Sequence, residues 1–77
     1  DLYAVSHPGE NGFTWDNRNP YAAECGHKLP DRRLDYILAR HPNHALANLT
    51  ACDLAYQEPD PRSIWASDHF GLLADFR

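Results

Sequence analysis

The clearest pattern in the chain is an alternation of side-chain types between residues 33 and 40. One side of an extended backbone there would carry Leu34, Tyr36 and Leu38, and the other would carry Arg33, Asp35, Ile37 and Ala39. Because successive side chains of a strand point to opposite faces, this pattern predicts a β-strand over residues 33–40.

Two further strands are predicted downstream. Residues 45–56 show a weaker alternation through Leu46, Leu49 and Ala51. Residues 69–76 place four apolar side chains on one face, namely Phe70, Leu72, Ala74 and Phe76. The prolines between them, Pro59 and Pro61, exclude residues 57–62 from a sheet interior. The sequence therefore predicts about three mostly antiparallel strands.

The first half of the chain gives weaker signals. Residues 1–5 are too few to decide between a helix and a strand, and Pro8, Gly9 and Gly12 then indicate turns. Residues 13–15 have strand-like side chains, and the polar segment 16–31 is typical of a long surface loop. No segment has the pattern of an amphipathic helix.

Length and charge limit the possible functions. The 77 residues make one small unit, and seven basic against eleven acidic residues give a formal net charge of −4. A module that binds nucleic acid through a positive field is thereby disfavoured. The chain has no apolar run long enough to span a bilayer, and it begins without methionine. It is interpreted as a piece of a longer protein.

Two polar clusters interrupt the predicted strands. Asp35 lies in the middle of an apolar strand, where a carboxylate needs a partner or a metal ion. Ser67, Asp68 and His69 open the last strand. Each cluster alone has an ordinary explanation: Asp35 as the ion-pair partner of Arg33 or Arg40, and the tripeptide as a surface turn. The combination of the two clusters favours a catalytic site.

These residue types suit the hydrolysis of a phosphoester. Asp68 offers a hard oxygen ligand for Mg²⁺, which binds through one or two carboxylates and the substrate phosphate. His69 beside it would take a proton from an attacking water or donate to the phosphoryl oxygens. Asp35 is the candidate that accepts a hydrogen bond from the other ring nitrogen and orients the imidazole.

A resemblance extends this hypothesis. The segment Arg33-Leu34-Asp35-Tyr36-Ile37-Leu38, followed by Ser67-Asp68-His69-Phe70-Gly71-Leu72, resembles the last two signature blocks of the endonuclease/exonuclease/phosphatase superfamily. The segment Gly12-Phe13-Thr14-Trp15-Asp16 with Asn19-Pro20 is similar to the sphingomyelinase-like branch, which narrows the family only loosely. The resemblance covers nearly the whole chain.

The resemblance implies a fold and a role. Residues 1–77 would be the C-terminal fragment of one α+β domain, a four-layer α/β sandwich. The parent would hydrolyse a phosphoester with Mg²⁺ or Mn²⁺, with His69, Asp35 and Asp68 as catalytic residues and Asp68 at the metal. The substrate would be a phospholipid, a small phosphodiester or a nucleic acid, with the first two slightly favoured.

The same resemblance leaves one alternative open. The family's other metal ligands would precede Asp1, so the isolated fragment is expected to be inactive and poorly folded. The rival interpretation is a non-catalytic binding or scaffolding module that retains the fold without those upstream residues.

The remaining polar and aromatic residues are better explained by structural roles than by binding or catalysis. Cys25, His27, His41 and His44 fit no usual zinc spacing, and Cys25 and Cys52 are more typical of two buried free thiols than of a single bridge. Trp15 and Trp65 are more typical of a core than of a substrate platform.

Overall fold

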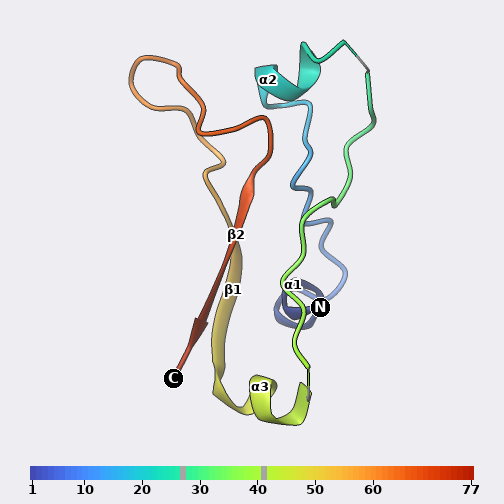
Figure 1. The fold of residues 1–77 in the computed structure, drawn as a ribbon, viewed down its shortest axis with the longest axis vertical. Helices are drawn as coiled ribbons and strands as arrows, with labels where there is room; N and C mark the ends of the chain where they lie inside the picture. The colour runs from blue at the N-terminus through green and yellow to red at the C-terminus, as the bar shows by residue number, and fades with distance from the viewer. Residues whose placement is uncertain (27, 41) are drawn as a thin grey trace.

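The structure is a computed structural model that describes residues 1–26, 28–40 and 42–77. It contains α1 (Leu2–Ser6), α2 (Pro20–Ala23), α3 (Pro42–Asn48), β1 (Leu49–Ala55) and β2 (Gly71–Phe76). The predicted mixture of helix and antiparallel strand is confirmed. In Figure 1 the pair of strands runs beside the extended segment 33–40, with α2 near one end of the molecule and α3 at the other.

The sheet consists of β1 and β2, which pair antiparallel from Leu49 opposite Phe76 to Ala55 opposite Gly71. The pairing is irregular between Leu49 and Ala51. The strand predicted over residues 69–76 is therefore confirmed within two residues. Its inward face is also confirmed in part, since Phe70 is buried and Leu72 and Ala74 are half-buried, whereas Phe76 is 50% exposed.

The strand predicted over residues 45–56 is wrong in its first part. Those residues begin inside α3, and the strand starts only at Leu49. Pro42 stands at the first helical position, where its missing N–H group would have no partner in any case. Leu46 and Ala47 then have high helix propensity. Local propensity therefore outweighs the weak alternation in this segment.

The strand predicted over residues 33–40 is extended but lies outside the sheet. Its backbone is bonded elsewhere: the amides of Leu34 and Asp35 donate to Thr14 Oγ1, and the carbonyl of Ile37 accepts from the Leu2 amide. The strand-like residues 13–15 form only one isolated bridge, between Trp15 and Arg32. Within the described ranges the sheet has two strands, so the expectation of three is wrong.

The alternation itself is confirmed. Asp35, Ile37 and Ala39 are half-buried, while their neighbours on the other side are exposed, namely Leu34, Tyr36 and Leu38. An extended backbone has this twofold periodicity whether or not a second strand pairs with it. The pattern thus predicted the conformation of the segment and could not predict its hydrogen-bond partners.

The larger core lies between α1 and the sheet. Leu2, Tyr3 and Cys52 are buried there, and Ile37 and Leu72 pack against them with other half-buried apolar residues. The first helix can begin at Leu2 because the Asp1 side chain accepts a hydrogen bond from the Ala4 amide at 3.1 Å.

Five more residues are buried outside that core, each at most 4% exposed, namely Thr14, Trp15, Asn19, Ala22 and Phe70. Two of them are joined directly, since the Phe70 amide donates to the Thr14 carbonyl at 2.7 Å. Trp15 is therefore buried, as expected, and the ring of the half-buried Trp65 stacks on Phe70. Several of these residues support the side chains described next.

Two further observations concern the cysteines and the helices. Cys25 and Cys52 are both free, and only Cys52 is fully buried. None of the helices in the described ranges is long and apolar enough to cross a membrane.

Candidate active site

Asp35 and His69, two residues expected to act together, are in direct contact. The Nδ1 atom of His69 lies 2.6 Å from Oδ2 of Asp35, although the residues are 34 positions apart. Their side chains are 34% and 45% exposed for His69 and Asp35, respectively. The pair therefore lies at the surface, where a solvent molecule or a substrate can approach it.

The backbone at Asp35 is held by a buried threonine, Thr14. Thr14 is fully buried, and its Oγ1 atom accepts hydrogen bonds from the amides of Leu34 at 2.9 Å and Asp35 at 3.1 Å. The extended segment that carries Asp35 is further anchored by the Trp15 and Arg32 bridge. Alternation then turns the Asp35 side chain toward the molecule while Leu34 and Tyr36 face outward.

His69 is held by the loop that precedes β2. Its amide donates to Ser67 Oγ at 3.1 Å, and the next amide, of Phe70, donates to the Thr14 carbonyl at 2.7 Å. The rings of Trp15 and His69 meet in a T-shaped arrangement at a centroid distance of 5.3 Å. These contacts fix the ring plane as well as the backbone.

Arg33 and His69 each pair with a different aspartate. The guanidinium of Arg33 makes two hydrogen bonds to Asp1, at 2.8 and 2.9 Å. It does not serve as the partner of Asp35, so this part of the ordinary explanation for Asp35 is wrong. His69 takes that place instead.

The environment of Asp35 favours its ionised form. Partial burial by itself raises the pKa of this carboxyl group. Hydrogen bonds from His69 and from the Thr14 hydroxyl, together with the charge of His69, outweigh burial and lower the pKa below its usual range. An ionised Asp35 accepts a hydrogen bond from Nδ1–H of His69, and this favours the tautomer that leaves Nε2 with a lone pair.

Asp68, the expected metal ligand, is exposed and lies beside the pair in the sequence. One of its carboxylate oxygens accepts a hydrogen bond from Ser67 Oγ at 3.2 Å. Among the described residues no group of three histidine, cysteine, aspartate or glutamate side chains is placed to hold a metal ion. Asp68 is thus a single carboxylate, whereas the retention of Mg²⁺ takes several converging oxygen ligands.

Cys25 and the histidines near it in the sequence form no metal site among the described residues. Cys25 is half-buried on the loop after α2. His27 and His41 lie outside the described residues. Nothing in the described part of the chain therefore supports that site.

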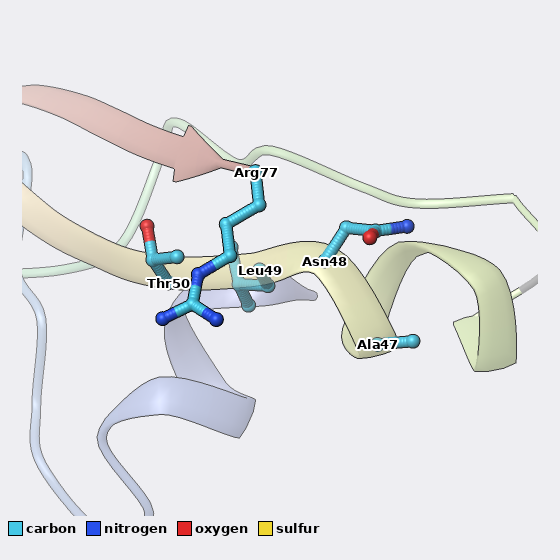
Figure 2. Close-up of a pocket in the computed structure, with 5 residues that line it drawn as sticks. All are labelled: Ala47, Asn48, Leu49, Thr50 and Arg77. Carbon is cyan, nitrogen blue, oxygen red and sulfur yellow. The ribbon is translucent and has the colours of Figure 1, made fainter.

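Two hollows lie near the sheet. One, of about 360 Å³, is formed by the loop that leads into Ser67, with Tyr56, Ile64 and Trp65 among its lining residues. The other, of about 350 Å³, lies where α3 meets β1 and is lined by Ala47, Asn48, Leu49, Thr50 and Arg77 (Figure 2). Leu49 and Ala55 are the two ends of β1, and Ala55 pairs with Gly71, which follows His69 by two residues. The second hollow lies at the Leu49 end and is therefore roughly 20 Å from the end near His69.

The sequence interpretation missed two supporting residues. Asn19 is fully buried: its Oδ1 accepts from the Tyr21 amide at 3.0 Å, and its Nδ2 donates to the Ser67 carbonyl at 2.7 Å. It therefore caps α2 and ties this helix to the loop before His69. The dipeptide Asn19-Pro20 is a recognisable helix start, so the cap could have been predicted. Thr14 carries no comparable signal.

Comparisons of the chain with family models, with curated proteins and with solved structures found no match.

Proposed function

We propose that this chain supplies the general-base half of a phosphoester hydrolase, with His69 as the base and Asp35 as the residue that orients it. The observation that carries this proposal is the 2.6 Å contact between His69 Nδ1 and Asp35 Oδ2. The contact joins two residues selected from sequence alone, and it leaves the second ring nitrogen available for proton transfer.

The proton path follows from the tautomer. Asp35 accepts a hydrogen bond from Nδ1–H of His69, so Nε2 carries the free lone pair. Nε2 accepts a proton from a water molecule while the water oxygen attacks phosphorus and the ester P–O bond breaks. The resulting imidazolium is stabilised by the Asp35 carboxylate, and its new proton then passes to the leaving oxygen or to solvent.

The divalent ion of the proposal, Mg²⁺ or Mn²⁺, would polarise the phosphoryl oxygen and stabilise the leaving group when it is bound. Asp68 would be one of its ligands. The described residues supply too few oxygen ligands by themselves. We therefore propose that a preceding segment of the same protein supplies the others, together with the second sheet of a four-layer sandwich.

The experiment compares two proteins, the 77-residue chain and the full-length protein that contains it. Each is assayed for hydrolysis of bis(p-nitrophenyl) phosphate with Mg²⁺, with Mn²⁺ and with EDTA. We expect metal-dependent turnover in the full-length protein and none in the 77-residue chain. Phosphatidylcholine or sphingomyelin vesicles, single-stranded DNA and a small alkyl phosphodiester then distinguish the substrate classes.

Matched variants test the roles of His69 and Asp68. His69→Gln and Asp68→Asn should each lower kcat by about a hundredfold or more while the circular dichroism spectrum is retained. His7→Gln and Asp75→Asn are the controls, because each makes the same chemical change away from the proposed site. Full activity in both site variants would refute the proposal, and absence of turnover in the full-length protein would favour a binding or scaffolding module.

A further inference from the structure

Thr14 contacts the backbone on both sides of the Asp35 and His69 pair. On one side its Oγ1 accepts from the amides of Leu34 and Asp35 at 2.9 and 3.1 Å. On the other side its carbonyl oxygen accepts from the Phe70 amide, directly after His69, at 2.7 Å. One fully buried residue thus joins two segments that are far apart in the sequence.

The hydroxyl group has a further use. A hydroxyl oxygen accepts two hydrogen bonds and still has its own proton to donate. The two amides occupy its acceptor positions, and hydrogen bonding by the Thr14 hydroxyl is one of the causes that lower the pKa of Asp35. Valine has the same shape but lacks the oxygen, and cysteine offers only a weak acceptor, so neither satisfies the two amides as a hydroxyl does.

We propose that Thr14 is the positioning residue of the site: it fixes where the Asp35 carboxylate lies and holds His69 against it. The kinetic part of this inference rests on the proposed hydrolase function, whereas its geometric part does not. Thr14 acts through Asp35 and His69, and it needs no contact with a substrate.

The first test is geometric and needs no substrate. Thr14→Val keeps the shape of the side chain and removes the hydroxyl, and Thr14→Ser keeps the hydroxyl. In ¹H–¹⁵N spectra of the full-length protein, at one fixed pH, we expect a protected His69 Nδ1–H signal in the wild type and in Thr14→Ser. We expect that signal to be lost in Thr14→Val. Thr50→Val is the control, because Thr50 is exposed and its hydroxyl donates to the Asp75 carbonyl instead.

The second test uses the full-length protein and the phosphodiester assay. Displacement of a catalytic pair by a fraction of an ångström to 1 Å costs about 10- to 100-fold in rate, so kcat of Thr14→Val should fall by roughly that factor. KM should change by less than about threefold, because substrate binding is not altered, and Thr14→Ser should restore kcat to within about threefold of the wild type. A merely structural role would not produce this division between kcat and KM.

Distinct outcomes separate the two proposals. A Thr14→Val protein that keeps both the Nδ1–H signal and the wild-type kcat would overturn the positioning role and leave the hydrolase proposal standing. A wild-type protein without turnover would count against the hydrolase, while the NMR comparison would still decide the role of Thr14. If Thr14→Val does not fold, Thr14→Cys replaces it: a weakened signal supports the inference, and an unchanged signal overturns it.

Discussion

The Nδ1 atom of His69 lies 2.6 Å from Oδ2 of Asp35, and the chain contains a second pair with nearly the same geometry. In that pair Nε2 of His7 lies 2.8 Å from Oδ1 of Asp53. The difference between them is the other ring nitrogen. Nδ1 of His7 also faces a carboxylate, that of Glu10, at 3.0 Å. The described contacts of His69 include no second carboxylate, so of these two histidines it is His69 that retains a nitrogen for proton transfer.

This contrast supplies a matched mutational test. Asp35→Asn should lower kcat of the full-length protein by roughly tenfold or more, because an amide can orient the ring but cannot stabilise the imidazolium. Asp53→Asn makes the same change at the His7 pair and should leave kcat near the wild-type value. The measurement is steady-state hydrolysis of the phosphodiester under saturating metal. Equal losses in both variants would indicate a general effect on stability and contradict the assignment.

The His7 pair predicts a pH-dependent stability. A neutral imidazole has one N–H group, so only the imidazolium donates to both Asp53 and Glu10. The hydrogen bond to Asp53 is the main cause that raises the pKa of His7 above 6.5. A raised folded-state pKa gives stability that is fully present below the unfolded value and is lost as the pH rises through the folded value.

The measurement is urea unfolding at several pH values between about 6 and about 8.5. We expect the unfolding midpoint of the wild type to fall across this range, and we expect His7→Gln to remove most of that slope. Two buried groups near His7 stay neutral in this window, because burial raises the pKa of Tyr3 above 10.0 and that of Cys52 above 9.0. An unchanged slope in His7→Gln would rule out the His7 pair as its cause.

The sequence predicted the contact between Asp35 and His69 better than the elements that carry these residues. Asp35 and His69 were selected because each is a polar interruption in an apolar alternation, and that signal depends only on local chemistry. The structure confirms that they meet. The partner of the segment around Asp35 was predicted wrongly, because a strand and an unpaired extended segment share the same twofold alternation.

The supporting residues could be predicted only in part. Asn19 precedes a proline at a helix start, which is a local signal for a cap. The local sequence around Thr14 does not indicate a supporting role, because the amides that its hydroxyl oxygen binds are 20 and 21 positions away in the chain. Likewise, nothing local indicated that His7 would meet Asp53, which is 46 positions away.

The turn before Thr14 provides a test of local stability. Gly12 has a φ of +62°, and a Cβ atom there would fall against the ring of the buried Tyr3. Gly12→Ala should therefore cost about 2–4 kcal/mol, the sum of a left-handed backbone and an overpacked core. Gly9→Ala is the control, because Gly9 has a φ of +79° with open space around it and should cost about 1–2 kcal/mol.

The comparison uses the free energy of unfolding from urea titrations of the two variants and the wild type. A larger loss for Gly12→Ala than for Gly9→Ala would locate the cost in the Tyr3 contact. Equal losses would show that the backbone conformation alone accounts for it and that the Tyr3 ring can move aside.

The last prediction concerns the outward row of the extended segment, which consists of Leu34, Tyr36 and Leu38. These side chains are 41%, 51% and 72% exposed, and the segment that carries them is extended without a place in the sheet. An extended backbone with an apolar row is a template for association with another chain. We expect the isolated 77-residue chain to self-associate as its concentration rises. Leu38→Glu should reduce the association measured by sedimentation velocity, because it places a charge in the row. Val5→Glu adds the same charge at a 51% exposed position on α1, so an equal reduction in both variants would assign the effect to net charge and contradict the role of the row.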